Sequence, residues 1–257
     1  MKKKHSKEFS KMGSVSQKDI YLYGKHPVSL ALENKRRIVR EVLLLSSSVD
    51  KIKLPKNTPF KIVSKDQLDA LVGKEAVHQG IVARCQPLPQ YDIADILDEV
   101  VDDKALFVIL DQVTDPHNIG AVLRSAAAFN AKAVIVPQNG APDETGVLAK
   151  SASGALELIP LIKVKNLTRA MDELKENGFW CIGLDGYAKQ SVYQTKLPKK
   201  CVIVMGSEGD GLRRLTSESC DGTVKLPMNP AVESLNVSNA CAIALYEWNR
   251  QHLSGEK

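Results

Sequence analysis

Short, continuously apolar runs alternate with segments of helical periodicity from about residue 105 to the end of the chain. Runs without polar alternation are typical of strands buried on both faces, as in a parallel sheet covered by helices. The pattern predicts strands at 106–110, 133–136, 158–164, 180–184, 201–205 and 224–226, and helices at 120–129, 144–151, 167–176, 212–219 and 237–251. The second part of the chain is therefore expected to form an α/β parallel-sheet domain.

A smaller α/β unit is predicted before that sheet. Apolar residues at helical spacing predict a short helix that ends at 35–37, and strands are expected at 42–45, 61–63 and 81–84 around a helix at 66–72. Pro87 and Pro89 then mark a stiff linker, because proline fixes φ and lacks an N–H donor. The predicted units are a leader (1–19), a small α/β domain (20–86), a linker with one short helix (87–104) and the parallel-sheet domain (105–257).

Composition narrows the class of protein. The chain has 257 residues, 44% of them hydrophobic and 25% charged, which is typical of one or two globular domains. Its apolar runs fall far short of the roughly 20 residues needed to span a bilayer, so no membrane partner is expected. The five cysteines are scattered and form no C-x-x-C pair, which argues against disulfides and a zinc site and favours a reducing cytoplasm.

Positive charge is concentrated near the N-terminus. Residues 1–65 hold 16 Lys and Arg against 5 Asp and Glu, whereas the remaining residues hold 19 against 25. This asymmetry predicts a polyanionic partner for the first part of the chain. For Lys2, Lys3, Lys4, Lys7 and Lys11 alone, a merely soluble basic tail is the simpler explanation of the charge. The leader lacks the apolar core of a secretory signal and matches a mitochondrial transit peptide poorly.

Ligands of open α/β sheets bind beyond the carboxyl ends of the strands, so the segments after three predicted strands are of interest. The first, 111–124, reads D-Q-V-T-D-P-H-N-I-G-A-V-L-R. Asn118 is expected to cap the following helix, and Gly120 permits close approach by backbone or ligand. Arg124 lies among small and apolar residues, so its guanidinium needs an anionic or carbonyl partner, in either a salt bridge or a substrate. His117 reads more simply as a hydrogen-bonding loop residue than as a catalyst.

The second segment, 206–214, reads G-S-E-G-D-G-L-R-R. Three glycines within six positions expose backbone N–H groups in a manner suited to a nucleotide-like ligand. The order matches neither a Rossmann fingerprint nor a P-loop. Glu208, flanked by this glycine-rich sequence, is expected to bind backbone or ligand, although an idle surface position is the alternative.

The third segment, 226–239, reads L-P-M-N-P-A-V-E-S-L-N-V-S-N and leads into the last helix. Its two prolines exclude regular structure in the first half. Ser234, Asn236 and Ser238 place hydroxyl and amide groups at the helix start. Helix capping explains one such side chain, and the surplus indicates a site.

Together, D-P-H-N-I-G-A-x-x-R, G-S-E-G-D-G and L-P-M…S-L-N-V-S, in this order at successive strand ends, resemble the three motifs of the SpoU (TrmH-like) RNA ribose 2′-O-methyltransferases of the SPOUT class. The resemblance covers residues 106–251. In addition, Y-G-x-H-x-V at 23–28 and H-Q-G-I-V-A at 78–83 look like the small RNA-binding domain of the branch that modifies a guanosine of 23S, large-subunit ribosomal RNA.

The resemblance implies a deep trefoil knot in the parallel-sheet domain, S-adenosylmethionine as methyl donor without a metal, and a homodimer whose site uses both subunits. The cofactor-binding positions that it implies are Gly206, Leu226, Met228 and Leu235. The positions that it implies for substrate and catalysis are Asn118, Arg124, Glu208, Ser234 and Asn236. Asn130 replaces a glycine that is frequent after the first helix, a mild departure because Asn tolerates a left-handed cap.

The implied reaction is an in-line attack of a ribose 2′-hydroxyl on a sulfonium methyl group. The family resemblance assigns the role of base to Arg124, but a guanidinium ordinarily keeps its proton, so phosphate binding and stabilisation of the developing alkoxide is the alternative. Two other functions stay open. One is the same chemistry on transfer RNA, and the other is a non-enzymatic RNA-binding or ribosome-assembly factor on the same fold.

Overall fold

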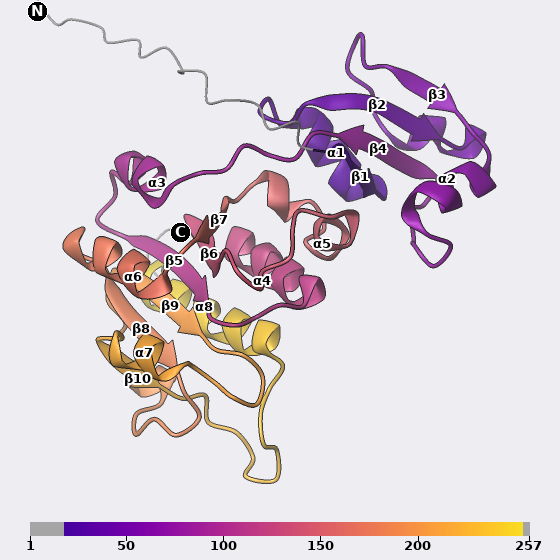
Figure 1. Ribbon diagram of the computed structural model, residues 1–257. Helices are drawn as coiled ribbons and strands as arrows, with labels where there is room; N and C mark the ends of the chain where they lie inside the picture. Colours follow the sequence, from indigo (N-terminus) through magenta and orange to yellow (C-terminus); the bar gives the residue numbers. More distant parts are fainter. Residues whose placement is uncertain (1–17, 254–257) are drawn as a thin grey trace, which may run out of the picture.

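The computed structural model describes residues 18–253, which form two β-sheets joined by an extended segment with one short helix (Figure 1). The five lysines of the leader lie outside the described residues. No described helix is long and apolar enough to cross a bilayer.

The first unit is a four-stranded sheet in the order β1-β4-β2-β3. Strand β4 pairs antiparallel with both β1 and β2, and only β2 and β3 are parallel. The three strands and two helices expected here are present, and β1 is a further strand. The elements are β1 (Ile20–Tyr23), α1 (Lys25–Glu33), β2 (Val39–Leu44), the 3-10 helix η1 (Ser46–Lys51), β3 (Phe60–Ile62), α2 (Lys65–Val72) and β4 (Ile81–Cys85).

The second unit is the predicted parallel sheet. Its six strands have the order β10-β8-β9-β5-β6-β7, and every pairing is parallel. Helix α3 (Ile93–Glu99) precedes it. The elements are β5 (Ala105–Leu110), α4 (Pro116–Ala128), β6 (Ala133–Pro137), α5 (Gly146–Ser151), η2 (Ala155–Glu157), β7 (Leu161–Val164), α6 (Leu167–Glu176), β8 (Trp180–Leu184), η3 (Val192–Gln194), β9 (Lys200–Met205), α7 (Arg214–Glu218), β10 (Gly222–Val224) and α8 (Val237–Leu253).

Helices cover both faces of this sheet, as predicted. This burial on both sides explains why its strands are apolar without interruption. On β5, Leu106 and Val108 pack with residues of α4, α5 and α8, whereas Phe107 and Ile109 pack with α3 and α6. All four side chains are fully buried. Alternating side chains of one strand thus enter two different cores. The deep trefoil knot stays a prediction.

The start of α4 differs from the expectation. The N-cap is Asp115, not Asn118, because Pro116 occupies the first helical position and the Asp115 carboxylate accepts the His117 backbone N–H at 2.9 Å. Asn118 therefore lies inside the first turn, with its side chain free for other partners. At the other end, Asn130 has a φ of 55°, so it does adopt the left-handed conformation expected of it.

The first unit packs directly against the second. Buried residues of α1, β2 and β4 belong to the same hydrophobic cluster as those of β5, α4 and α5. At this contact Arg37 has no exposed side-chain surface and forms ion pairs with both Glu144 and Glu157. It also donates to the carbonyl oxygen of Gln86 at 2.8 Å. One buried guanidinium therefore ties the first unit and the linker to the second unit.

Candidate functional site

The three predicted segments leave the carboxyl end of the parallel sheet. Strands β5 and β9 are neighbours, with Leu110 opposite Met205, so the segments that follow them begin side by side. The third segment starts two strands further along the sheet, after β10, and runs to the first turn of α8 (Figure 1). Residues separated by more than 100 positions in the sequence meet here.

Asn118, Glu208 and Asn236 form one hydrogen-bonded cluster, with one side chain from each segment. Glu208 Oε1 accepts from Asn236 Nδ2 at 2.7 Å and from Asn118 Nδ2 at 3.3 Å. Asn236 Nδ2 also donates to Asn118 Oδ1 at 2.9 Å. The same Glu208 oxygen accepts the backbone N–H of Val237 at 3.1 Å, at the start of α8. A carboxylate that accepts several hydrogen bonds fixes the loops that carry the donors.

Asn236 has a second task as the cap of α8. Its Oδ1 accepts the backbone N–H of Ser238 at 3.0 Å and the hydroxyl of Ser238 at 2.5 Å. Helix capping therefore explains only part of the role of the polar residues Ser234, Asn236 and Ser238 at this helix start. The Asn236 amide nitrogen points away from the helix into the cluster with Glu208 and Asn118.

The glycine-rich loop after β9 closes tightly on itself. Ser207 and Gly211 exchange both backbone N–H···O bonds at 3.1 Å, and Gly211 has a φ of 67° that favours glycine. A Cβ atom on Gly206 would clash with the backbone of Gly211. The hydroxyl of Ser207 is buried without a hydrogen-bond partner in the described chain. A bound ligand or an ordered water can supply the hydrogen bond that this buried hydroxyl lacks.

Asp111 and Arg213 are functional candidates that sequence reasoning missed. Asp111 is fully buried, and its carboxylate binds Arg213 Nε at 2.7 Å and Arg213 Nη2 at 2.6 Å. It also accepts the Arg213 backbone N–H at 3.2 Å. This pair clamps the second segment to the end of β5. An aspartate directly after six apolar residues was the available signal, because a buried carboxylate requires a partner.

Arg124 does not join the cluster. It is exposed, and no hydrogen bond or ion pair involves its side chain within residues 18–253. Arg124 follows Asn118 by six positions, about 120° around the helix, so the two side chains leave α4 in different directions. His117 lies on the same face as Arg124 and contacts Ser151 Oγ through Nδ1 at 3.0 Å. Among the residues that the structure describes, no anion therefore neutralises the Arg124 guanidinium.

The predicted cofactor positions lie along the loops that border the cluster. Gly206 is buried, Leu226 and Leu235 are partly buried, and Met228 is 37% exposed. Ser234 is exposed in the same loop. In the described chain the backbone groups of Leu226 and Leu235 bind no other protein group. The backbone groups of Leu226 and Leu235 are therefore available to a ligand at this edge of the sheet.

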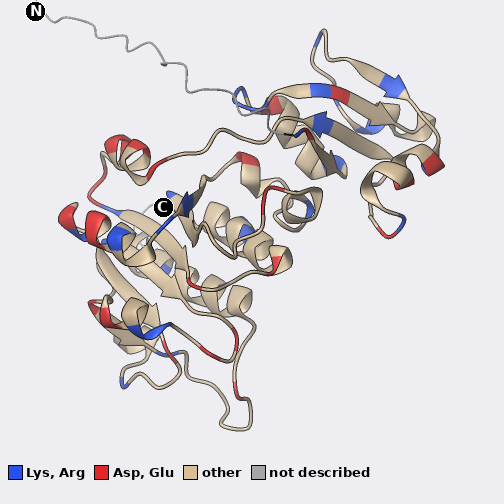
Figure 2. Ribbon diagram, in the orientation of Figure 1, with Lys and Arg blue, Asp and Glu red and all other residues tan. Residues whose placement is uncertain are grey.

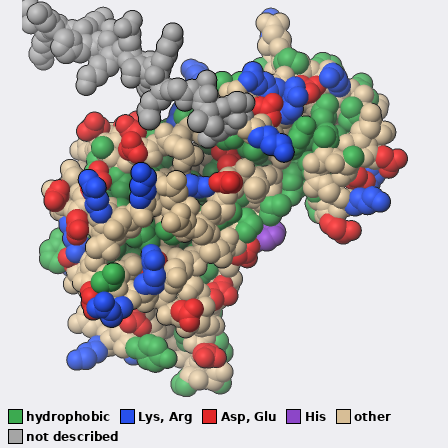
Figure 3. Space-filling model, viewed as in Figure 1, with side chains coloured by type: hydrophobic (Ala, Val, Ile, Leu, Met, Phe, Trp, Pro, Cys, Tyr) green, Lys and Arg blue, Asp and Glu red, His purple; other side chains and the backbone are tan. Residues whose placement is uncertain are grey.

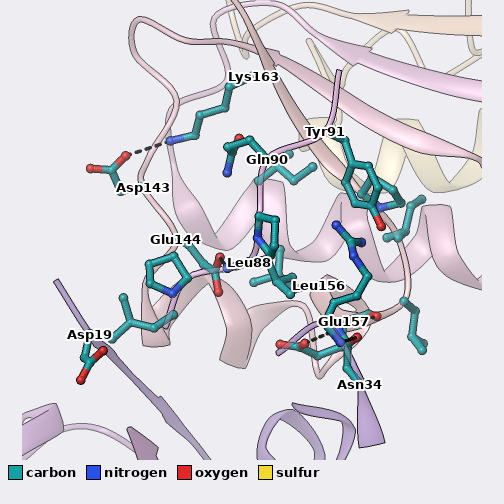
Figure 4. Close-up of a pocket in the computed structure, with 18 of the residues that line it drawn as sticks. Asp19, Asn34, Leu88, Gln90, Tyr91, Asp143, Glu144, Leu156, Glu157 and Lys163 are labelled. Carbon is teal, nitrogen blue, oxygen red and sulfur yellow. Dashed lines mark hydrogen bonds and ion pairs between the residues drawn. The ribbon is translucent and has the colours of Figure 1, made fainter. Parts of the chain in front are cut away.

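A cavity of about 540 Å³ lies elsewhere, at the junction of the two units. Figure 4 shows Lys163 paired with Asp143 on one side of it and Asn34 pointing toward Glu157 on the other. None of its lining residues belongs to the three segments. The cavity is therefore a feature of the contact between the units and is separate from the hydrogen-bonded cluster.

Two family models match the chain. The SpoU rRNA Methylase family model matches residues 105–246. The model for RNA 2′-O ribose methyltransferase substrate binding matches residues 21–91. All three segments fall within the first match.

Similar proteins are found among characterised relatives and solved structures. The 23S rRNA (guanosine-2′-O-)-methyltransferases RlmB of Salmonella typhimurium and Escherichia coli are each 42% identical over 238 residues, which cover 90% of this chain and 98% of theirs. The SpoU methyltransferase AviRb of Streptomyces viridochromogenes in complex with AdoMet is 28% identical, with a TM-score of 0.77 over 93% of this chain and 92% of that one. A TrmH/SpoU tRNA modifying enzyme of A. aeolicus, 26% identical, covers 62% of this chain and 82% of its own at a TM-score of 0.53.

Proposed function

The chain belongs to the SpoU rRNA methylase family, and on that premise we propose that it is an S-adenosylmethionine-dependent RNA methyltransferase. Its substrate is the ribose 2′-hydroxyl of a guanosine in large-subunit, 23S-type ribosomal RNA. The observation that carries this proposal is the meeting of Asn118, Glu208 and Asn236, from three distant motifs, in one cluster at the carboxyl edge of the sheet. The match over 90% of the chain to enzymes named for this reaction supports the choice of substrate.

The loop residues are suited to S-adenosylmethionine. Gly206 permits the tight turn, and among residues 18–253 the buried hydroxyl of Ser207 and the backbone groups of Leu226 and Leu235 have no protein partner. Met228 lies in the same loop as the two leucines. When bound, S-adenosylmethionine supplies an electrophilic methyl group on a sulfonium sulfur. We propose that this loop fixes the direction of that methyl group relative to the ribose oxygen.

Arg124 acts on the substrate side. Its exposed, positively charged guanidinium has no anionic partner among residues 18–253. It therefore binds the phosphate next to the target ribose and stabilises negative charge that develops on the 2′-oxygen. Glu208 and Asn118 fix the loops that surround the reacting atoms, while Ser234 and Asn236 bind the substrate or hold the third segment in place.

The two units have different roles, RNA binding in the first and methyl transfer in the second. We propose that residues 20–86 bind RNA, that 87–104 link the units and that 105–257 carry the reaction. Figure 2 shows lysine and arginine on β2, β3 and β4, and Figure 3 shows blue side chains gathered over this part of the surface. Three of them, Arg40, Lys61 and Arg84, have side chains that are 40–68% exposed, and within the described chain their ion pairs are with Asp19 and Glu41. Such a surface attracts a polyanion through counterion release.

The functional unit is a homodimer in the cytoplasm. On α8, Ile243 and Tyr246 are 45% and 55% exposed on one helix face, an apolar surface suited to a second copy. The five cysteines are scattered through the sequence without a C-x-x-C pair, which is typical of proteins in a reducing compartment. Sedimentation equilibrium of the wild-type protein and of Tyr246→Glu tests the dimer, since a charge at its centre would dissociate it. An unchanged mass for the variant would exclude this face.

The substrate is tested by mapping alkali-resistant 2′-O-methyl sites in total RNA from cells with and without the gene. One site lost from large-subunit ribosomal RNA, restored by purified protein and S-adenosylmethionine in vitro, is the expected result. Loss of a site in transfer RNA would instead assign the transfer-RNA function. RNA binding without any cofactor binding in calorimetry would identify a non-enzymatic ribosome-assembly factor.

A further inference from the structure

Helix α5 is held between the first unit and the helix that carries Asn118 and Arg124. A Cβ atom on Gly146, at the start of α5, would clash with the backbone of Tyr21 in β1. On the other side, a Cβ on Gly120 of α4 would lie 2.8 Å from the backbone nitrogen of Ala152, at the end of α5. Backbone contact without intervening side chains leaves little room for sliding. The position of the first unit relative to α4 is therefore set through α5.

Lys150 extends from α5 to the first unit. Its Nζ lies 3.4 Å from Gln79 Oε1, and a Cβ atom on Gly24 would lie 2.6 Å from the same Nζ. Gly24 and Gln79 belong to the two sequence motifs of the first unit. The described chain offers Lys150 no carboxylate, and partial burial lowers the pKa of its ammonium. A partly desolvated cation with one distant neutral acceptor is stabilised by an external anion.

The polar surface continues from Lys150 onto α4. The next residue, Ser151, contacts His117 Nδ1 at 3.0 Å, which leaves His117 Nε2 without a partner in the described chain. His117 is exposed and lies seven positions before Arg124, two turns away on the same helix face. Lys150, His117 and Arg124 thus lead from the motifs of the first unit to the residue proposed to act on the substrate. None of the three has an acidic partner within the described residues.

We infer that Lys150 and His117 bind backbone phosphates of the RNA between the first unit and the site of methyl transfer. This inference rests on the proposed function and adds two positioning residues to it. The junction is suited to RNA because the segments on either side of it belong to the matched substrate-binding and methylase regions. Two phosphate contacts on α5 and α4 would fix the register of the strand, so that one ribose reaches Arg124.

Salt-dependent RNA binding tests the inference. Full-length Lys150→Gln, Lys150→Arg, His117→Ala and the control Lys196→Gln are compared for affinity toward a large-subunit rRNA fragment. Lys196 is an exposed lysine that forms no ion pair within the described residues, and it lies before β9 at the opposite end of the sheet. Loss of one charge-assisted phosphate contact raises the dissociation constant about tenfold for Lys150→Gln, and loss of a neutral hydrogen bond raises it about threefold for His117→Ala. For Lys150→Gln, the slope of the logarithm of the binding constant against the logarithm of the salt concentration decreases by about the amount of one phosphate contact.

Lys150→Arg keeps both affinity and salt dependence, because it keeps the charge, and Lys196→Gln behaves as the wild type. In methyl-transfer assays the Lys150→Gln effect falls on KM more than on kcat. Wild-type salt dependence in Lys150→Gln would overturn the inference. So would equal losses in Lys150→Arg and Lys150→Gln with lowered melting temperatures, since these would indicate packing alone. Failure of the wild type to methylate any rRNA would instead overturn the proposed function. The RNA-binding measurements do not depend on methyl transfer, so the two outcomes can be told apart.

Discussion

The side-chain amide of Asn236 donates to Glu208 Oε1 across 2.7 Å and joins the start of α8 to the loop after β9. The same oxygen also receives hydrogen bonds from Asn118 and from the Val237 backbone. One carboxylate thus holds three segments that are distant in sequence. This arrangement makes Glu208 the most sensitive position of the cluster to a change of charge or of donor and acceptor pattern.

Glu208→Gln is expected to reduce methyl transfer strongly without unfolding the protein. The substitution removes the negative charge and can place an NH₂ group against the amide donors of Asn118 and Asn236. Hydrogen bonds to a charged group contribute about 1.5–3 kcal/mol, so kcat should fall by about one to two orders of magnitude. Steady-state kinetics beside thermal unfolding measures this. Asp210→Asn, in the same loop but without a hydrogen bond to the cluster, is the matched control. Equal kcat in Glu208→Gln and wild type would contradict the role.

Arg124→Ala is expected to retain binding of S-adenosylmethionine and to abolish methyl transfer. The side chain is exposed and makes no hydrogen bond or ion pair in the described chain, so its removal costs little stability, about 0.5 kcal/mol or less. Calorimetry with the cofactor and single-turnover methylation of rRNA separate the two effects. Arg124→Lys should retain part of the activity because it retains a positive charge. Near wild-type turnover in Arg124→Ala would remove Arg124 from the mechanism.

Gly206→Ala is expected to disrupt cofactor binding. Its Cβ would clash with the Gly211 backbone, which cannot move without breaking the paired hydrogen bonds between Ser207 and Gly211. Gly186→Ala is the control, since a Cβ there meets no atom within 4 Å. Equilibrium dialysis with labelled S-adenosylmethionine should show a loss of more than about tenfold, or 1.4 kcal/mol, for Gly206→Ala only. Equal affinities in the two variants would mean that the loop does not hold the cofactor.

Arg37→Met is expected to destabilise the contact between the two units. The side chain of Arg37 is fully buried, and its removal leaves Glu157 and Glu144, with side chains 2% and 11% exposed, without their cation. Breaking a buried pair costs about 3–5 kcal/mol. Arg40→Met is the control, because Arg40 is 45% exposed and lies 3.8 Å from Asp19. Urea unfolding measures both variants, and a cost under about 1 kcal/mol for Arg37→Met would contradict the proposed importance of the pair.

Glu144 gives stability a characteristic pH dependence. Burial raises the pKa of its carboxyl, with Glu157 adding to the effect, although Arg37 and the Leu88 N–H oppose it. A carboxyl whose pKa is higher in the folded state contributes stability that is present at low pH and is lost as pH rises through that folded-state pKa. Glu144→Gln should therefore show a flatter decline in the free energy of unfolding above about pH 4.5 than the wild type. Parallel pH curves for the two proteins would refute this.

Most elements could be predicted because each depends on short-range patterns. The apolar runs predicted all six strands of the parallel sheet and the 3.6-residue periodicity predicted its helices, with ends that differ by at most four residues. The start of α4 was misplaced because both Asp115 and Asn118 are good caps, and Pro116 decided between them. Asp111 was missed because burial of a single carboxylate depends on Arg213, 102 positions away.

The sequence by itself determined which residue types stand at the strand ends, because strands, caps and turns follow from neighbouring residues. The sequence also contains the family motifs, which can be identified from their order along the chain without knowing which residues they contact. Only the tertiary structure decided that Glu208 binds Asn118 and Asn236 while Arg124 points elsewhere, since the order of strands in the sheet sets which loops meet. It also placed α5 between the two units, where Gly146 and Gly120 allow backbones to touch in a way that no local pattern encodes.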